Sequence, residues 1–239
     1  MLDQFGSNDP DDYIAGFPDH PHRGFITLTY MLDGHMRHED SMGNSGDLKS
    51  GGVQWMKAAR GVIHSEMPQQ ENGLMRGFQL WINLPASEKM SDPEYQEYTA
   101  SDIPSATVSN STVKVIGGVF DGLHGPIVDP HTNLVYLDVQ LAATESLTTD
   151  TDPGAEHFVY VLDGMARIGS TEVPPQSLAV LSRGSKITVD SGPSGVRFIF
   201  VGGSPLNETV VHYGPFVMNT QAEIERAIDD YKSGRLTDK

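Results

Sequence analysis

Two short segments of the chain each carry two metal-ligand side chains separated by one residue: His20 with His22, and His64 with Glu66. In a β-strand, the side chains at positions i and i+2 project from the same face. The spacing therefore predicts that each pair lies on one face of a strand. Two such strands facing each other would bring together three imidazoles and one carboxylate, so the expected fold must supply paired strands.

The sequence contains many short runs of β-branched and aromatic residues that are separated by turn residues. The run from Phe25 to Leu32 ends at Asp33-Gly34, a dipeptide typical of hairpin turns, and residues 35–40 are expected to form the return strand. The chain has 25 Gly and 15 Pro, which favour frequent turns. Short strands at short intervals without helical periodicity predict an all-β fold of the barrel type.

A five-residue motif occurs twice in the chain. Residues 30–34 read Tyr-Met-Leu-Asp-Gly, and residues 160–164 read Tyr-Val-Leu-Asp-Gly. Each copy is expected to end a strand and begin a hairpin, and self-similarity of this kind suggests two copies of one barrel. Two unrelated strand–turn signals are the alternative, but a histidine-bearing segment precedes each copy and favours duplication.

A polar connection over residues 85–112 predicts a domain boundary near residue 100. We expect the first domain, residues 1–100, to carry the metal site. The second domain, residues 101–239, is expected to lack a complete site, because His157 ahead of the second motif has no ligand partner two residues away.

The C-terminal segment has a different periodicity. Thr220 and Glu223 have the spacing of a capping box, which predicts the start of a helix. The apolar residues that follow, spaced as one face of a helix, are Ile224, Ala227, Ile228 and Tyr231. This helix is expected to pack against a barrel.

Composition excludes several classes of protein. The net charge of −16 argues against direct binding to nucleic acid or to an anionic membrane, because both need a basic face. The absence of cysteine excludes disulfides, iron–sulfur clusters and thiol nucleophiles. No secretory signal and no apolar run long enough to cross a bilayer is present, so a cytoplasmic protein is expected.

The ligand set also indicates which metal to expect. Three neutral imidazoles and one carboxylate, without sulfur, suit a divalent first-row metal with open coordination positions, as in a catalytic site. Fe(II) is the first expectation, and Mn, Ni, Co, Cu and Zn remain open. His35 and His38 are competing candidates, but a strand sends side chains at i and i+3 to opposite faces, so both are expected to be exposed hairpin residues.

Three stretches of the sequence, residues 17–25, 34–68 and 212–220, resemble the pirin family of the cupin superfamily. The resemblance implies a bicupin, with two antiparallel β-barrels of the double-stranded β-helix or jelly-roll type and one metal, usually iron, in the first barrel. Pirins usually carry further strands before the segment that begins here, so a short or truncated form is expected. The metal ligands that the family motif implies are His20, His22, His64 and Glu66.

This chain departs from the general cupin pattern at one position. A glutamate usually follows the two histidines of the motif, and this chain has Ile26 there. We therefore take Glu66 as the carboxylate ligand and expect Ile26 to line the pocket or to pack behind it.

The resemblance also implies an activity. Several pirins resemble quercetin 2,3-dioxygenases, which open a flavonol ring with O2 and release carbon monoxide. The substrates implied are a small flavonol-like aromatic and O2, with Glu66 as the catalytic group that accepts the proton of the flavonol hydroxyl. Residues expected to form an apolar wall for the flat substrate, unless each is ordinary core, are Phe25, Trp55, Met56, Phe78 and Trp81.

Two other functions stay open. Some pirin-like proteins resemble regulators, so a non-catalytic metal- or redox-sensitive protein that acts through protein partners is the main alternative. A metal-dependent isomerase or hydrolase would use the same ligands on another substrate, because a fold does not settle a function. Arg23 and Arg60 are expected either to orient a substrate phenolate or to form salt bridges at the rim.

Overall fold

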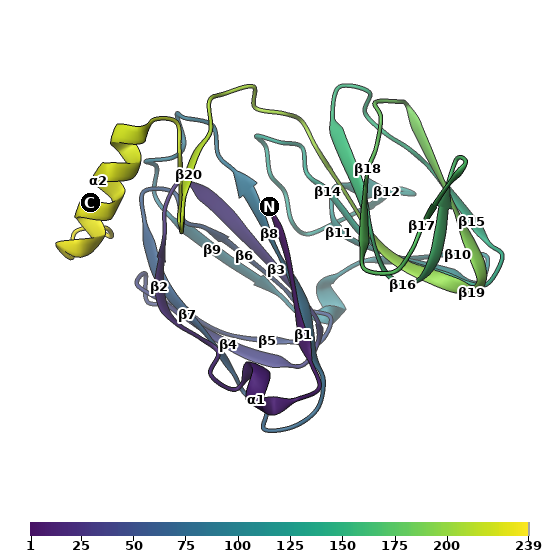
Figure 1. Cartoon of the computed structure of the whole chain (residues 1–239), viewed down its shortest axis with the longest axis horizontal. Helices are drawn as coiled ribbons and strands as arrows, with labels where there is room; N and C mark the ends of the chain where they lie inside the picture. The colour runs from purple at the N-terminus through teal and green to yellow at the C-terminus, as the bar shows by residue number, and fades with distance from the viewer. Residues whose placement is uncertain (239) are drawn as a thin grey trace. The chain divides into compact units, whose positions relative to one another are not determined.

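The computed structural model describes residues 1–238, which form mostly β-strands (Figure 1). The chain divides into two compact units, Met1–Ser101 together with the segment from Asn207 onward, and Asp102–Leu206. The expectation of a mainly β protein with a C-terminal helix is confirmed. The helix groups with the first unit, although the sequence had placed it with the second domain, because its packing partners lie on strands of the first unit.

Two larger antiparallel sheets face each other in the first unit (Figure 1). One has five strands in the order β1-β8-β3-β6-β9, and the other has four in the order β2-β7-β4-β5. Within residues 1–238 both sheets keep open edges, so the strand pairing does not close a barrel. The strands of the first sheet are β1 (Leu2–Ser7), β3 (Phe25–Asp33), β6 (Val53–Lys57), β8 (Met75–Asn83) and β9 (Glu94–Tyr98). Those of the second are β2 (Phe17–His22), β4 (His35–Asp40), β5 (Ser45–Lys49) and β7 (Val62–Pro68).

The turn between β3 and β4 is a corner between the two sheets. β3 pairs with β6 and β8, whereas β4 pairs with β5 and β7, so the expected hairpin at Asp33-Gly34 is wrong. The second copy of the motif lies inside one long strand, β16 (Glu156–Ile168), whose pairing with its neighbour shifts register on both sides of Gly164. Gly34 and Gly164 both have positive φ, a conformation that glycine adopts without steric cost. The repeated motif therefore marks a bend of the chain, and neither copy begins a hairpin.

The C-terminal segment returns to the first unit as a small hairpin followed by a helix. The hairpin consists of β20 (Val211–Tyr213) and β21 (Phe216–Met218), and α2 (Gln221–Lys232) follows it. Thr220 is the N-cap of α2 and forms the predicted capping box with Glu223. The buried residues of the helix are Ile224 and Ala227, which pack on Phe216 and Met218, whereas Tyr231 of the predicted apolar face is exposed.

The second unit contains one eight-stranded antiparallel sheet with its own apolar core. The strand order is β10-β11-β14-β19-β16-β17, with β15 paired to β19 and β18 paired to β16. The strands of this sheet other than β16 are β10 (Ser105–Val108), β11 (Ser111–Gly117), β14 (Val135–Leu141), β15 (Ser146–Asp150), β17 (Thr171–Val173), β18 (Ser177–Val180) and β19 (Lys186–Gly203). The shorter elements of the chain are α1 (Pro10–Tyr13), a 3-10 helix (Ala100–Asp102), β12 (Val119–Phe120) and β13 (Leu123–His124).

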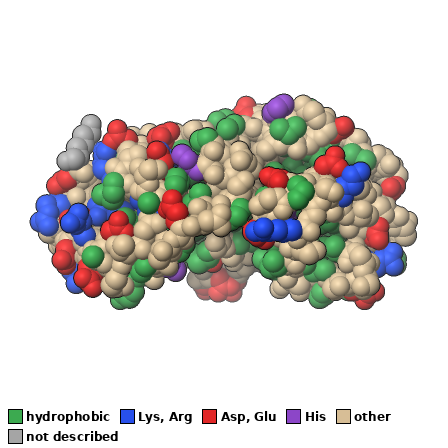
Figure 2. Space-filling model, turned by 90° about the horizontal axis from the view of Figure 1, so that it is seen from above, with side chains coloured by type: hydrophobic (Ala, Val, Ile, Leu, Met, Phe, Trp, Pro, Cys, Tyr) green, Lys and Arg blue, Asp and Glu red, His purple; other side chains and the backbone are tan. Residues whose placement is uncertain are grey.

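Acidic side chains are spread over the face of the molecule in Figure 2 and do not gather in one patch. This distribution agrees with the strongly negative net charge. Within residues 1–238, every helix is too short or too polar to cross a membrane.

Candidate metal centre

The candidate metal ligands lie on two neighbouring strands. β2 and β7 pair antiparallel, with His20 directly opposite His64 and His22 opposite Val62. Residues opposite each other in such a pair share a face of the sheet. The ring centroids of His20 and His64 are 4.3 Å apart, those of His20 and His22 are 4.8 Å apart, and those of His22 and His64 are 5.0 Å apart. The alternating pattern therefore places three imidazoles in one cluster, as the sequence predicts.

One nitrogen from each ring of this cluster is available to a single cation. The ligand atoms of His20, His22 and His64 all lie within 4.8 Å of one another. His20 Nδ1 lies 2.8 Å from the carbonyl oxygen of Pro18 and donates to it. This bond leaves Nε2 of His20 as the free acceptor, because a neutral imidazole carries only one N–H.

Unpartnered nitrogens in the cluster show that a metal ion fits this site. Within residues 1–238, His22 Nδ1, His22 Nε2 and His64 Nε2 are buried without a hydrogen-bond partner. A buried polar atom left without a partner costs about 1–3 kcal/mol, so native structures rarely keep three together. A divalent cation bound to one nitrogen of His22 and to Nε2 of His64 would remove most of that cost, and nitrogen donors suit first-row metals.

Burial keeps the rings of His22 and His64 neutral and ready to bind a cation. Burial lowers the pKa of His22 to about 3, the charge of His20 adds to this effect, and the backbone of Pro215 opposes it. Burial and the three neighbouring histidines also lower the pKa of His64 well below its ordinary value. Metal ligation requires the deprotonated ring, so protons compete weakly with a metal at these two residues.

Glu66 lies near the cluster, but its carboxylate has other partners. It accepts hydrogen bonds from Thr29 Oγ1 at 3.3 Å and from Gln79 Nε2 at 3.1 Å. Both donors come from the facing sheet, so Glu66 bridges the two sheets. Burial raises the pKa of Glu66, and the nearby histidines and these two hydrogen bonds oppose the rise. Its role as the fourth ligand stays a prediction.

Two further histidines of this unit differ in their surroundings. His35 is partly exposed and lies 2.9 Å from Asp47, as expected for a hairpin residue. The expectation of an exposed His38 is wrong, because only 1% of its surface is accessible. His38 lies inside because β4 is an interior strand of its sheet and the Tyr95 ring of β9 stacks on it. The spacing of His38 and Asp40 at i and i+2, as in the two ligand pairs, was the signal that could have identified this inward face.

An aromatic pocket of about 200 Å³ adjoins the cluster. Phe25 and Trp81 line it and stack with ring centroids 4.1 Å apart, and His212 meets the Trp81 ring edge-on at 5.9 Å. The His22 ring lies 5.1 Å from Phe25 and 5.4 Å from Trp81, so this aromatic pair separates the pocket from a candidate ligand. Only the return of the C-terminal segment places His212 here, so no local signal in the sequence identifies it.

The other residues expected in an apolar wall belong to the packed interior. Trp55, Met56 and Phe78 are each at most 6% exposed and do not line this pocket. Ile26 is buried as well, at 1% exposure.

Arg23 and Arg60 form salt bridges, which was one of the two roles expected of them. Arg23 pairs with Asp230 at 2.8 Å, and Arg60 pairs with Asp92. Arg23 is itself buried, so it lies inside the unit and not at a rim.

Known proteins match this chain along nearly its whole length. The family model for Pirin matches residues 1–82, and the model for the Pirin C-terminal cupin domain matches residues 136–237. A protein of Pseudomonas aeruginosa described as a putative quercetin 2,3-dioxygenase is 47% identical over 99% of this chain and 85% of its own length. A pirin-like protein of Caulobacter vibrioides is 44% identical over 99% of this chain and 86% of its own length.

A solved structure agrees with these relatives. The crystal structure of a quercetin 2,3-dioxygenase from Acinetobacter baumannii matches with a TM-score of 0.92 and 36% identity, covering 98% of this chain and 84% of that one. Because both halves of the sequence match pirin models and its relatives align over nearly all of this chain, it belongs to the pirin family.

Proposed function

We propose that this protein is a metal-dependent dioxygenase that cleaves the ring of a flavonol such as quercetin with O2. The observation that carries the proposal is the cluster of His20, His22 and His64, which has unpartnered nitrogens on His22 and His64 and lies behind the Phe25–Trp81 pair that lines an aromatic pocket. Such a pocket next to convergent polar groups is the usual form of a small-molecule site. The names of the Pseudomonas and Acinetobacter proteins support the same reaction.

The three histidines would hold the metal, which we propose to be Fe(II), with Glu66 as a fourth ligand. When bound, a divalent cation would lower the pKa of the flavonol 3-hydroxyl and promote the reaction with O2. Burial raises the pKa of Glu66, which makes its carboxylate a stronger base, and we assign it the proton of that hydroxyl. Thr29 and Gln79 hold the carboxylate in place through their hydrogen bonds.

The aromatic pocket would hold the flat substrate. Phe25 and Trp81 offer stacked ring faces, and His212 covers one edge of Trp81. An aromatic ligand would exclude water from this wall.

We also propose a division into two domains, a single metal site and a cellular compartment. Each half of the chain would be a cupin barrel, with a boundary near residue 100, a metal site in the first barrel and none in the second. Two observations support this division. The buried histidine of the second unit is His157, and within residues 1–238 three metal-ligand side chains converge only at the histidines of the first unit. The cytoplasm is the proposed compartment.

The test is a flavonol assay on protein loaded anaerobically with Fe(II). Admission of O2 should cause a catalytic loss of quercetin absorbance with release of carbon monoxide. His64→Ala should lose both the bound metal and turnover, while the matched control His35→Ala should keep both. Loaded protein that binds quercetin but turns over no more than one equivalent would contradict the enzyme and favour a regulatory protein.

A further inference from the structure

A histidine–aspartate pair lies directly behind one of the candidate ligands. His38 and Asp40 lie on β4 opposite Glu66 and His64 of β7, on the same face of the sheet. The His38 side chain is 1% exposed, and that of Asp40 is fully buried. The proposed reaction gives neither residue a role.

Asp40 is held as a carboxylate that only accepts hydrogen bonds. Its Oδ1 accepts from the backbone N–H groups of Met42 at 2.9 Å and Asn44 at 3.0 Å, and its Oδ2 accepts from Asn44 Nδ2 at 2.9 Å. Burial raises the pKa of Asp40, but the hydrogen bonds from His38 and Asn44 outweigh it and hold the pKa below its ordinary value. The contact of 3.2 Å between His38 Nε2 and Asp40 Oδ2 therefore has the histidine as donor.

The tautomer of His38 fixes the tautomer of His64. A neutral imidazole that donates from Nε2 can only accept at Nδ1. The nearest partner of His38 Nδ1 is His64 Nδ1 at 3.3 Å, so His64 is the donor. His64 then carries its proton on Nδ1 and leaves Nε2 as a free lone pair. This is the atom that is buried without a partner in the cluster.

The His38 ring is also held from its face. Tyr95 stacks on it with ring centroids 4.7 Å apart and an angle of 23° between the planes. The Tyr95 hydroxyl donates to Glu97 at 2.6 Å and accepts from Gln54 Nε2 at 3.1 Å. Asp40, His64 and Tyr95 therefore fix the orientation of the His38 ring.

We propose that His38 is a positioning residue for the metal centre, with Asp40 setting the direction of its hydrogen bonds so that His64 presents Nε2 to the metal. Partners of this kind orient metal ligands and strengthen them as donors. The inference rests on the metal site of the proposed function and is independent of the flavonol reaction.

The first test reads the tautomers in the metal-free full chain by ¹⁵N NMR of the imidazole rings. The expected result is a proton on Nδ1 of His64 and on Nε2 of His38. A proton on Nε2 of His64 would overturn the proposal whether or not the protein binds a metal.

The second test uses Asp40→Asn, which keeps the size of the side chain and reverses the two hydrogen bonds at Oδ2, from His38 and from Asn44 Nδ2. The Asn44 amide can rotate to present its oxygen, so His38 is the partner that must change. The carbonyl oxygen of the new Asn would still accept hydrogen bonds from the backbone N–H groups of Met42 and Asn44. Its amide nitrogen would then face His38 Nε2 as a donor. His38 would then donate from Nδ1, and His64 would have to carry its proton on Nε2. The affinity for Co(II) should fall by about 10–100-fold, with a changed visible spectrum of the bound Co(II).

Substitutions of His38 separate positioning from packing. His38→Phe keeps an aromatic ring against Tyr95 but offers no hydrogen-bond acceptor to His64 Nδ1. It should weaken Co(II) binding as much as Asp40→Asn does. His38→Asn offers a side-chain carbonyl to His64 Nδ1 and should stay near the wild-type affinity, also when combined with Asp40→Asn. Asp47→Asn, at the exposed pair with His35, is the matched control and should change nothing.

The outcomes distinguish failure of the positioning role of His38 from failure of the metal site. Equal Co(II) affinity in wild type and Asp40→Asn, or no advantage of His38→Asn over His38→Phe, would overturn the positioning role. Wild-type protein that binds no Co(II) would overturn the metal site, while the NMR tautomers would still decide the hydrogen-bond chain. Circular dichroism checks that each variant folds. If His38→Phe does not fold, the comparison of Asp40→Asn with His38→Asn still tests the positioning role.

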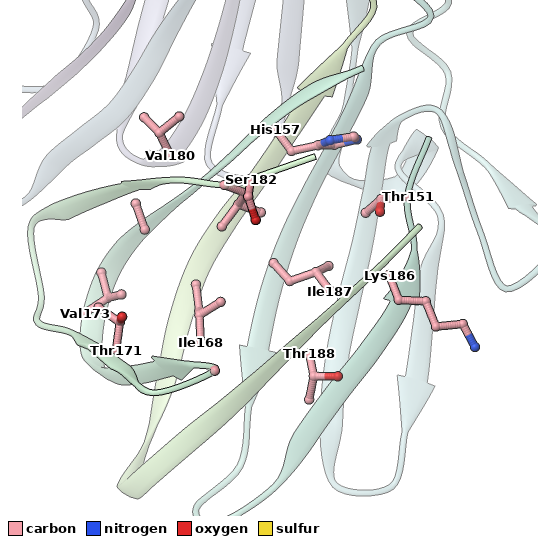
Figure 3. A pocket seen from close by; sticks show the side chains of 13 residues that line it. Thr151, His157, Ile168, Thr171, Val173, Val180, Ser182, Lys186, Ile187 and Thr188 are labelled. Atoms are coloured by element: carbon pink, nitrogen blue, oxygen red, sulfur yellow. The ribbon is translucent and has the colours of Figure 1, made fainter. Parts of the chain in front are cut away.

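A different observation in the second unit carries an independent inference. A cavity of about 440 Å³ opens between its strands, with His157 at one end and Thr188 at the other (Figure 3). Its walls combine aliphatic side chains with hydroxyl groups. Lining residues that matter here are Thr151, His157, Ile168, Val173, Leu181 and Thr188.

His157 is the buried polar side chain of this cavity. It is 6% exposed, and its ring stacks on Phe200 with centroids 5.4 Å apart and planes 6° apart. Within residues 1–238 its ring nitrogens have no hydrogen-bond partner. Burial lowers the pKa of His157, opposed by Asp152 and Glu156, so the ring is neutral near pH 7 and offers one donor and one acceptor.

We infer that this cavity binds a small uncharged phenol, with its ring against Ile168 and Leu181 and its hydroxyl on His157. Apolar walls with a few polar groups are typical of ligand sites. An anion is disfavoured because Lys186 at the cavity lies 3.7 Å from Asp150 and the chain is strongly acidic.

The probe for this site is 2-naphthol, followed by the methyl NMR signals of Ile168 and Ile187 in the full chain. Saturable shifts at both methyls are expected in the wild type, and His157→Phe should weaken them. In Ile168→Trp, whose indole narrows the cavity, the remaining signal of Ile187 should shift less. Absence of saturable shifts up to the solubility limit, or an unchanged Ile187 shift in Ile168→Trp, would overturn the inference. Trp81→Ala, in the pocket of the first unit, is the control and should leave these signals unchanged.

Discussion

Arg23 and Asp230 form an ion pair of 2.8 Å although 207 residues separate them in the sequence. Arg23 is buried, and it also donates to the backbone carbonyls of Leu236 at 3.1 Å and of Arg60. Arg23 directly follows His22, so the C-terminal segment is attached next to a candidate metal ligand. One side chain thus connects the last helix to the strand that carries two of the three histidines.

Replacement of Arg23 by Leu should destabilise the protein strongly. The change leaves two backbone carbonyls without their donor and Asp230, among residues 1–238, with only Arg235, at 3.7 Å. Breaking a buried ion pair costs about 3–5 kcal/mol. Because Asp230 is 21% exposed, we expect the lower end, about 3 kcal/mol, in urea unfolding. Arg37→Leu is the matched control. Arg37 pairs with Asp47 at the surface at 3.5 Å, so its loss should cost about 0–1 kcal/mol. Equal losses for both variants would contradict the role of Arg23.

Lys89 makes a second buried attachment of the C-terminal segment. Its Nζ donates to the carbonyl of Gly24 at 2.7 Å, to Asn83 Oδ1 at 2.6 Å and to the carbonyl of Val217 at 2.8 Å. Lys89→Met fills a similar volume but leaves two buried carbonyls and the partly buried Asn83 Oδ1 without their donor, at about 1–3 kcal/mol for each buried group before relaxation. We expect urea unfolding to show a loss of about 3 kcal/mol in total. Lys49→Met, at an exposed position on β5, should be neutral, and a neutral Lys89→Met would contradict the attachment.

The local part of this architecture was predictable from the sequence. The i, i+2 spacing of His20 with His22 depends only on strand geometry, and the three histidines do form one cluster. The capping box at Thr220 likewise depends on hydrogen bonds within one turn. Such features follow from residues close together in sequence.

Long-range placement was not predictable in the same way. Nothing near Lys89 or Arg23 in the sequence indicates that both would bind backbone carbonyls of a segment more than 100 residues away. The burial of His38 depends on Tyr95, which arrives from the facing sheet. The hairpin expected at Asp33-Gly34 was wrong because the turn joins two sheets, and local turn chemistry is the same in both cases.

Truncation of Trp81 should weaken substrate binding while the metal stays bound. Its ring forms one wall of the aromatic pocket and stacks on Phe25, so Trp81→Ala removes the apolar surface offered to a flavonol. An aromatic pair contributes about 0.5–1.5 kcal/mol beyond its buried area, which predicts a KM or Kd for quercetin raised by about 2- to 10-fold. Trp55→Phe, in the packed interior away from this pocket, is the control for loss of an indole. Unchanged quercetin binding in Trp81→Ala would place the substrate elsewhere.

Removal of the metal should make the protein sensitive to acid. The pKa of His22 is about 3 in the folded chain because burial excludes the charged ring, against an ordinary value of 6.5. Between these two values the unfolded chain binds a proton that the folded chain does not, so the free energy of unfolding must fall as the pH falls. Each pKa unit corresponds to about 1.4 kcal/mol, and the unfolded ring is already half protonated at its ordinary pKa. Metal-free protein should therefore lose about 2 kcal/mol from His22 between about pH 6.5 and about pH 4.5. Urea unfolding at the two pH values measures this loss, and His22→Gln, which cannot titrate, should show a smaller one. An identical pH dependence in the variant would mean that the burial of this ring does not control the acid sensitivity.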